Sequence, residues 1–245
     1  MIINIPIIGK ILIKRLEEQE LPSVSIGAIL TEIDTEIMIA CRAFYAWKAI
    51  HNFASGDRAI KSALNSNAET WNPILHSLQA TYIVAIGRIF DLDARSCSIH
   101  LLFRNCQKNV DQFNRENHKE RYMEGRTEEP DFLEDRLDGL YIPVKRDFKN
   151  LKKEVTRIQR IYETKYKPIR NQIFAHKDFG VLSDPGVLFY GTNINDIKDI
   201  LSTLYKVQRC IYDLYVNGHE FDFAYWELRE EDIIRDDVES LVRKL

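Results

Sequence analysis

Apolar residues recur every three or four positions along most of this 245-residue chain, which is the spacing of α-helices that bury one face. The first such stretch covers residues 26–47, and its helix is expected to end at Gly56, because glycine commonly follows the last helical turn. A second helix is predicted over residues 67–89, starting at Asn67, a residue suited to the N-cap. A shorter helix is expected over residues 98–108.

The second half of the chain has the same helical spacing with one interruption. A long helix is predicted over residues 144–173, with a kink at Pro168 because the apolar phase continues beyond it. Residues 181–190 instead contain two short extended runs around a Ser-Asp-Pro-Gly turn, which suggests a small β-hairpin. A helix over residues 193–218 and a final acidic helix over about residues 227–244 complete the pattern.

These elements predict an all-α fold, a bundle of four to five main helices with extra short helices and the one β-hairpin. The chain is expected to consist of an N-terminal arm (1–22), a helical domain (23–218) and an acidic C-terminal helix (219–245). Within the domain, residues 109–142 are polar and mixed in charge, which indicates an insertion with one helix near residues 112–123. A hydrophobic content of 45% is sufficient for a core of this size.

Charge is distributed unevenly along the chain. The whole sequence has a net charge of −3 and a pI of about 6.1, which excludes a uniformly basic nucleic-acid-binding protein. Residues 145–170 are the exception, since ten basic and three acidic side chains give them a net charge of +7. This stretch is suited to a polyanion such as RNA, although in most helices it is simply a solvated face. Residues 220–239 carry nine acids and two arginines, a tail that either solvates the C-terminus or shields the basic stretch.

The cysteines and the N-terminus bear on the cellular compartment. The four cysteines form no C-x-x-C pair and have no zinc-finger spacing, which is typical of small core residues in a reducing compartment such as the cytoplasm. The apolar N-terminus is interrupted by Lys10, Lys14 and Arg15 before the ~20 residues that a membrane span needs. It is therefore expected to be neither a signal peptide nor a membrane span.

Most of the chemical information lies in one segment near the end of the long helix. We call it the motif segment, and it reads Arg170-Asn171-Gln172-Ile173-Phe174-Ala175-His176-Lys177-Asp178. An arginine with a histidine five to seven positions later is by itself a weak signal, as Arg95 and His100 of this chain show. The asparagine at the second position and the location at a helix end make the motif segment more specific.

The motif segment resembles the signature of HEPN domains, and especially of their abortive-infection AbiU-like branch, where a similar string follows a long helix. Gly87-Arg88-Ile89-Phe90-Asp91 is similar to the end of the second helix in that branch. Together with the order of helices, the resemblance covers about residues 25–217. It implies a HEPN-type helical bundle, a ribonuclease that needs no metal or cofactor, and a homodimer with a composite active site.

Helical geometry also favours a site that two copies share. Arg170 and His176 are six residues apart, so at ~100° per residue they lie ~120° from each other on an α-helix and flank Ile173. One helix alone therefore makes a poor site. Two copies that meet across a twofold axis would bring both residue pairs into one cleft.

The chemistry needs few protein groups because RNA supplies its own nucleophile, the 2′-hydroxyl. His176 is the candidate general base or acid, since an imidazole with a pKa of about 6.5 can accept or donate a proton near neutrality. Arg170 is the candidate group that holds the scissile phosphate with two hydrogen bonds, and Asn171 would orient the phosphate or the histidine. The expected products are a 2′,3′-cyclic phosphate and a 5′-hydroxyl.

Two further groups of residues are assigned to the site. The candidate RNA-binding residues are Arg157, Arg160, Lys165, Lys167 and Lys177. The candidate supporting residues are Arg88, Asp91 and Asp178. A structural i,i+3 ion pair or a helix cap is the simpler interpretation of Arg88 and Asp91. Likewise, His176 follows Ile173 on the apolar stripe and would be structural if it were buried in the core.

The favoured function is an endoribonuclease toxin, of the abortive-infection or toxin–antitoxin kind, that acts as a homodimer on cellular or phage RNA. Its defence role comes entirely from the resemblance. One alternative is a non-catalytic helical module that dimerises and recruits a partner, such as a nucleotidyltransferase or an antitoxin. Another is an RNA-binding regulator that uses the basic stretch without cleavage. No membrane partner is expected.

Overall fold

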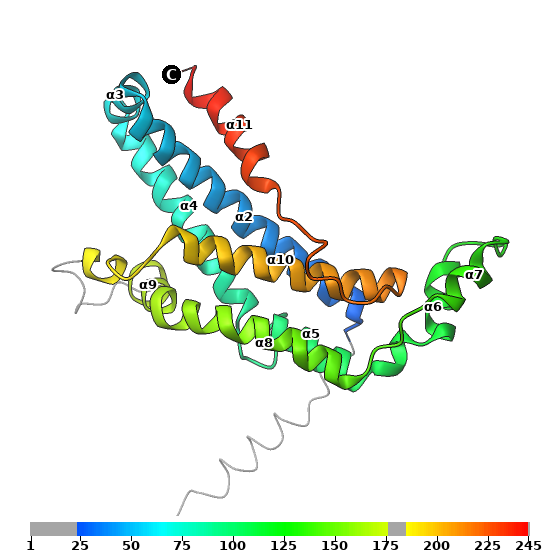
Figure 1. Ribbon diagram of the computed structural model, residues 1–245. Coiled ribbons are helices and arrows are strands. Elements are labelled where there is room, and N and C mark those ends of the chain that lie inside the picture. Colours follow the sequence, from blue (N-terminus) through cyan, green and yellow to red (C-terminus); the bar gives the residue numbers. More distant parts are fainter. Residues whose placement is uncertain (1–23, 176–184, 245) are drawn as a thin grey trace, which may run out of the picture.

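The computed structural model describes residues 24–175 and 185–244. These residues form helices joined by loops and contain no β-strand (Figure 1), so the all-α prediction is confirmed. None of the described helices is both long and apolar enough to cross a membrane. The main helices are α2 (Ile26–Gly56), α4 (Ala68–Ile89), α8 (Lys145–Ile161) and α10 (Ile194–Asn217).

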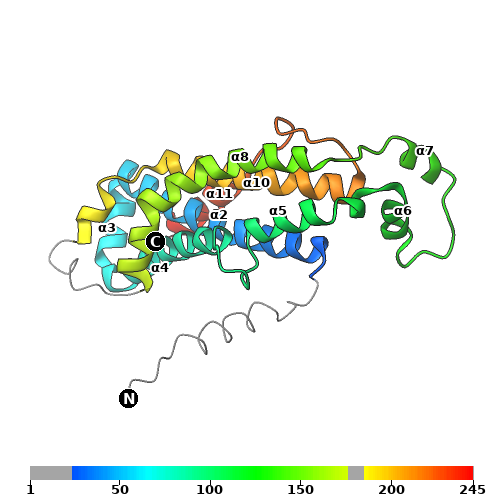
Figure 2. The same cartoon turned by 90° about the horizontal axis from the view of Figure 1, so that it is seen from below.

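The core of the bundle lies where α2, α4 and α10 meet. Figures 1 and 2 both show α2 and α4 side by side, with α10 crossing next to them. On α2, the fully buried residues Ile29, Ile33 and Ile37 follow one another every fourth position, as the periodicity predicts. The buried residues that α4 and α10 contribute to the same core include Ile83, Ile86, Leu201 and Leu204.

The end of α2 differs in detail from the prediction. Gly56 is the last residue of α2, so the helix ends where expected, but the glycine lies inside the helix instead of after it. Asp57 follows directly and starts another helix, α3 (Arg58–Ser66), which the pattern did not predict. The Asp57 carboxylate accepts hydrogen bonds from the N–H groups of Ala59 and Ile60 (2.8 and 3.3 Å). Because Asp57 caps α3 directly after α2, the two helices follow one another without the loop that Gly56 suggested.

α5 (Ile99–Lys108) lies where the third helix was predicted. Its N-cap is Ser98, whose hydroxyl oxygen accepts a hydrogen bond from the N–H of Leu101 (3.4 Å). α5 packs against both α2 and α8, so it closes one side of the bundle.

The long helix predicted over residues 144–173 is present, but it departs twice from α-helical winding. α8 passes into a π-helical segment, η2 (Tyr162–Tyr166), then into α9 (Lys167–Ile169) and a second π-helical segment, η3 (Arg170–Ala175). Pro168 lies in α9, and the chain remains helical beyond it as predicted. Proline lacks the N–H that would bond to the preceding turn and its ring crowds that turn, and the wider π turns relieve this conflict.

The β-hairpin predicted over residues 181–190 is wrong for the part that the structure describes, and residues 181–184 lie outside that part. Pro185–Phe189 forms a 3-10 helix, η5. The hydroxyl and the N–H of Thr192 both donate hydrogen bonds to the carbonyl of Phe189 (2.8 and 3.0 Å), which closes the turn into α10. An extended run needs a neighbouring strand to satisfy its backbone groups, and the neighbours here are helices.

The insertion at residues 109–142 projects from the bundle. Figures 1 and 2 place it at the end opposite to α9. It contains a 3-10 turn, η1 (Val110–Phe113), and two short helices, α6 (Arg115–Met123) and α7 (Leu133–Asp138). The prediction of one helix near residues 112–123 is met by α6, whereas α7 was not predicted.

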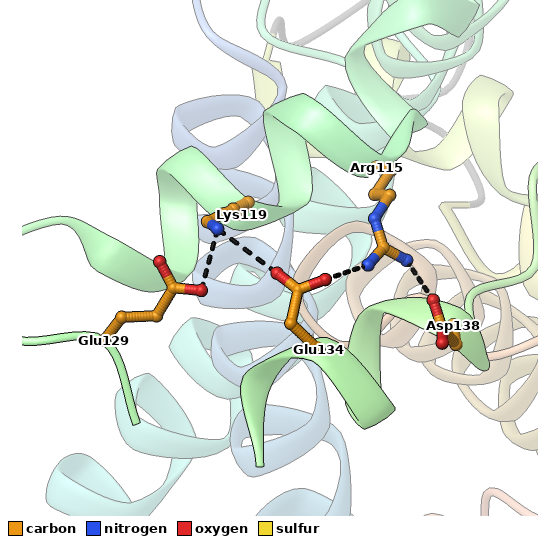
Figure 3. Close-up of polar contacts among 5 residues, drawn as sticks. All are labelled: Arg115, Lys119, Glu129, Glu134 and Asp138. Carbon is orange, nitrogen blue, oxygen red and sulfur yellow. Dashed lines mark hydrogen bonds and ion pairs between the residues drawn. The ribbon is translucent and has the colours of Figure 1, made fainter. Parts of the chain in front are cut away.

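Ion pairs hold α6 and α7 together (Figure 3). Arg115 bonds to Glu134 and Asp138, and Lys119 bonds to Glu129 (2.8 Å) and Glu134 (3.2 Å). All five side chains are substantially exposed, so a single pair stabilises the fold only slightly. Glu134 joins two cations, however, so these pairs act as one network across the α6–α7 hairpin.

The projection is anchored at the C-terminal end of α10. Gly218 ends α10 in a left-handed conformation (φ 71°), as predicted for a terminal glycine. Its carbonyl accepts a hydrogen bond from the N–H of Tyr141 (2.8 Å), and the side chain of Leu140 packs against its Cα. Arg136 donates a hydrogen bond to the side-chain oxygen of Asn217 (2.7 Å).

The final helix, α11 (Glu230–Val242), packs on α2 and not along α8 (Figure 1). Val238 is buried against α2 and α3, in a small second core. Glu231 pairs with Lys198 of α10 (2.6 Å) and with Lys48 of α2. The acidic α11 is therefore a bundle helix, and it does not shield the basic side chains of α8. Glu220, at the start of the acidic tail, lies beside Asn150 and Glu154 of α8.

Replacement of Gly218 by alanine is expected to lower the free energy of unfolding by about 2–3 kcal/mol. The added Cβ would require a left-handed backbone at φ 71° and would collide with Leu140. Gly125 is the matched control, because it has φ 75° but open space around the Cβ position. Gly125→Ala should therefore cost only the backbone strain of about 1 kcal/mol. Urea unfolding of both variants measures the difference, and equal losses would show that the Leu140 contact is unimportant.

His118 makes the anchored projection sensitive to acid. Its side chain is only 4% exposed, and burial together with the charges of Arg121 and Arg136 lowers its pKa to about 4. The unfolded chain takes up this proton below about pH 6.5. Between pH 6.5 and 4 the unfolded state therefore binds more protons, and stability falls as the pH is lowered. At pH 4.5 the expected loss is about 2 kcal/mol relative to pH 7.5.

The variant His118→Gln should not show this loss. Urea unfolding of the wild type and the variant at pH 7.5 and 4.5 provides the comparison. Carboxylates titrate in both proteins, so their contribution cancels in the difference. An identical pH dependence in both proteins would rule out His118 as its source.

Candidate functional site

The motif segment begins inside the second π-helical segment. η3 comprises six residues, Arg170–Ala175, whereas His176, Lys177 and Asp178 lie outside the described residues. π-Helical segments are rare and occur frequently at functional sites. The angle of ~120° between residues six apart holds for an α-helix, so it does not apply to η3.

The side chain of Arg170 crosses Gly87 of α4. A Cβ atom on Gly87 would lie 2.9 Å from Cδ and 3.0 Å from Nε of Arg170, and it would also collide with the hydroxyl of Tyr162. The missing side chain at position 87 therefore makes room for both. The Tyr162 hydroxyl donates a hydrogen bond to the carbonyl of Ile83 (3.2 Å), which fixes the ring beside the half-buried arginine.

The charge of Arg170 acts on two neighbours. Hydrogen bonds from the N–H of Asp93 and the hydroxyl of Ser96 (3.0 and 2.8 Å) hold the pKa of Asp91 below its usual range, and the charge of Arg170 adds to this effect. Burial raises the pKa of Tyr162, and the same arginine charge opposes the rise. Arg170 forms no ion pair with any described residue, so its charge is not neutralised by direct contact there.

Arg88 and Asp91 do not form the ion pair considered from their spacing. Arg88 pairs instead with Glu36 of α2 (3.1 Å), and the arginine head is 59% exposed. Asp91 accepts the N–H of Asp93 and so stabilises the loop that follows α4, whereas the helix caps on either side are Phe90 and Ser98. Arg88 therefore joins α2 to α4. Asp91 lies close enough to Arg170 to remain a candidate supporting residue.

Of the remaining described residues in the motif segment, some are exposed to solvent and others pack against the core. Asn171 is exposed, as a residue that contacts a ligand needs to be. Ile173 and Phe174 are partly buried and pack against the core. The Phe174 ring meets the imidazole of His76 of α4 edge to face, with 5.2 Å between centroids. An exposed imidazole that had no predicted function is thus next to the motif segment.

Two of the predicted RNA-binding residues form ion pairs with α10. Arg157 pairs with Asp199 of α10, with 3.0 Å between Nη2 and Oδ1, and Lys165 pairs with Asp196 of the same helix (2.7 Å). Arg160 and Lys167 are exposed. The fifth residue, Lys177, lies outside the described residues.

Sequence reasoning missed three residues that shape the site: Gly87, Glu36 and His76. Gly87 left a usable signal, because an isolated glycine inside an apolar helix often marks a close approach by another element. Glu36 and His76 left none, since their partners Arg88 and Phe174 are distant in the sequence.

The fold and the site together define the class of protein. An all-α bundle in which a long helix leads into an arginine-asparagine motif agrees with the HEPN resemblance of the sequence. A family model for AbiU2, a HEPN family, matches residues 23–236, so the chain belongs to this family. It is therefore an abortive-infection-related HEPN domain, as its resemblance predicted. No curated protein and no solved structure matched the chain.

Gly87→Ala is expected to lower the free energy of unfolding by about 1–3 kcal/mol, because the added Cβ overlaps Arg170 and Tyr162. The arginine side chain is flexible, so the tyrosine hydroxyl, held by its hydrogen bond, is the harder obstacle. Tyr162→Phe in the Gly87→Ala background should recover part of the loss. The expected coupling energy from a double-mutant cycle is at least ~0.5 kcal/mol.

Gly56→Ala serves as the control for this cycle. Nothing lies within 4 Å of a Cβ at position 56, and the residue is helical, so this change should be neutral or slightly stabilising. Strictly additive effects of the Gly87 and Tyr162 substitutions would contradict the close contact.

Proposed function

We propose that this chain is a metal-independent endoribonuclease of the HEPN type that acts as a toxin or antiphage effector. The observation that carries the proposal is the guanidinium of Arg170, which is half-buried beside Gly87 and Tyr162 without an ion-pair partner among the described residues. A cation that is held in place but not neutralised is suited to a phosphate. The exposed side-chain amide of Asn171 adds a donor and an acceptor next to it.

The proposed reaction is an internal transesterification of RNA. The imidazole of His176 removes the proton from a 2′-hydroxyl, and the 2′-oxygen forms a bond to the adjacent phosphorus. The bond between phosphorus and the 5′-oxygen breaks, and this oxygen takes up a proton from an imidazolium. Arg170 offsets the negative charge that grows on the phosphorane oxygens. The products are a 2′,3′-cyclic phosphate and a 5′-hydroxyl.

The active form is proposed to be a homodimer with a composite site. The side chain of Arg170 packs at Gly87, whereas Phe174 packs at His76, and these α4 positions are about 16 Å apart along the helix. From Arg170 to Phe174 the motif segment therefore runs along α4, away from the guanidinium. This direction favours a site in which the arginine of one copy meets the histidine of the other across a twofold axis.

A toxin of this kind also requires control. An antitoxin or a nucleotidyltransferase is the proposed partner. The competing function is a non-catalytic module that dimerises and recruits such a partner. It is favoured by the packing of Ile173 and Phe174 against the core, which would suit a purely structural motif segment.

An RNA-cleavage assay in excess chelator tests the proposed activity. The wild type is expected to cleave total RNA or tRNA and to leave 2′,3′-cyclic phosphate ends. His176→Ala should reduce the rate by about 10²–10⁴-fold, because it removes the general base or acid. Arg170→Lys keeps the charge but loses the two-pronged geometry, so it should reduce the rate by at least ~10-fold.

The control variant is Arg58→Ala, which removes an exposed arginine from α3, far from the motif segment in sequence. It should cleave at the wild-type rate when the dimer content is matched by size-exclusion chromatography. No cleavage by any of the proteins would favour the non-catalytic module. Equal cleavage by the wild type and His176→Ala would refute the proposed mechanism.

A further inference from the structure

α8 carries a row of basic side chains on its solvent-facing side. Lys149, Lys153 and Arg160 fall within about 40° of one another around the helix, on the far side from the buried residues Phe148 and Val155. All three are exposed. We call them the α8 stripe, and they span about 16 Å along the helix.

Two cations beside the stripe, Arg157 of α8 and Lys165 of η2, are used within the bundle. Arg157 and Lys165 point toward α10 and pair with Asp199 and Asp196. No residue of the α8 stripe has an ion pair among the described residues, and the bond from Lys153 goes to a neutral side-chain amide (3.1 Å). A ligand can therefore bind the stripe without breaking an existing pair, whereas at Arg157 or Lys165 it would have to compete with a carboxylate.

The basic surface continues from α8 onto α5. Burial lowers the pKa of His100, and the charge of Lys152 of α8 lowers it further, as does that of Arg104 of α5, while Glu163 opposes them. Lys152 and Arg104 therefore lie near the same imidazole, although they come from different helices, and both are exposed. They widen the α8 stripe toward α5.

A shallow groove runs beside the stripe at its C-terminal half. Its lining residues are Lys153, Thr156, Arg157, Gln159, Arg160 and Glu163. None of them is aromatic, so the groove offers no surface on which a base would stack. Apart from the carboxylate of Glu163, the side chains available are of the kinds that contact phosphate and sugar, and such contacts form without regard to sequence.

We propose that the α8 stripe, flanked by Arg104 and Lys152, binds the phosphate backbone of RNA. That the polyanion is RNA rests on the proposed function, whereas the surface is defined by the exposed and unpaired cations themselves. α8 continues through η2 and α9 into the motif segment, so a strand on the stripe lies on the same helical rod as Arg170. The stripe supplies affinity, and the motif segment supplies the chemistry.

Fluorescence anisotropy with a labelled 20-nucleotide oligouridine RNA tests this surface. Every protein carries His176→Ala, so that cleavage cannot affect binding. The test variant combines Lys149→Ala, Lys153→Ala and Arg160→Ala. The control variant removes the same charge from exposed cations of α2 and α3 by combining Arg42→Ala, Arg58→Ala and Lys61→Ala.

The stripe variant should bind RNA at least about tenfold more weakly than its parent near 0.1 M salt. The slope of log Kd against log salt should fall by about 2, since each lost phosphate contact on a single strand contributes ~0.7. The control variant should keep the parent slope and stay within about threefold of the parent affinity. Equal losses in both variants, or an unchanged affinity of the stripe variant, would overturn the proposal.

The RNA-binding test of the α8 stripe and the RNA-cleavage test can fail independently of each other. If the wild type does not cleave RNA but the stripe variant alone loses binding, the surface is established and the ribonuclease function fails. If the wild type cleaves and the stripe variant binds like its parent, the function stands and this surface is excluded.

Discussion

The close approach of the motif-bearing helix to α4 is the constraint on which the site depends. Gly87 permits it, because any side chain there would overlap Tyr162 and Arg170. Ile169 of the same helix is fully buried, so apolar packing holds the rod on α4 from one side while the glycine allows contact on the other. Among the described residues, Arg170 is thereby kept in place without the ion pair that usually anchors a half-buried arginine. Its position there results from packing, and no described carboxylate neutralises its charge by direct contact.

The cations on the continuous helix from α8 to η3 fall into two groups, which point in different directions. Arg157 and Lys165 pair with carboxylates of α10 and so belong to the architecture, whereas the α8 stripe faces solvent. Exposed pairs of this kind stabilise a fold only slightly, so their main effect is to set which side chains remain unoccupied. The same continuous helix therefore supplies both the ion pairs that join it to α10 and an exposed basic surface. The acidic α11 does not compete for that surface, because it packs on α2.

Periodicity was sufficient to predict the long helices, since α2, α4, α8 and α10 each bury one continuous face. It failed where a local group overrode the pattern. Asp57 restarts a helix directly after α2, and Pro185 leads into a 3-10 turn in place of a strand. In the site, Arg170 is half-buried and Asn171 is exposed. The catalytic roles of Arg170, Asn171 and His176 stay predictions. The pairs of Arg88 with Glu36 and of Arg157 with Asp199 join different helices, so no spacing rule predicts them.

The two π-helical segments have a consequence for how the chain tolerates changes in length. A wide turn stores one residue more than an α-helical turn of the same rise, so each segment behaves like an insertion that the helix has absorbed. Loss of a single residue from Tyr162–Tyr166 would return that stretch to regular winding and leave Arg170 in phase with α8. The same loss within α8, which stores no extra residue, would rotate Arg170 by about 100° and direct its guanidinium away from Gly87. In this part of the molecule the residue count, as much as the residue type, determines where the charge is presented.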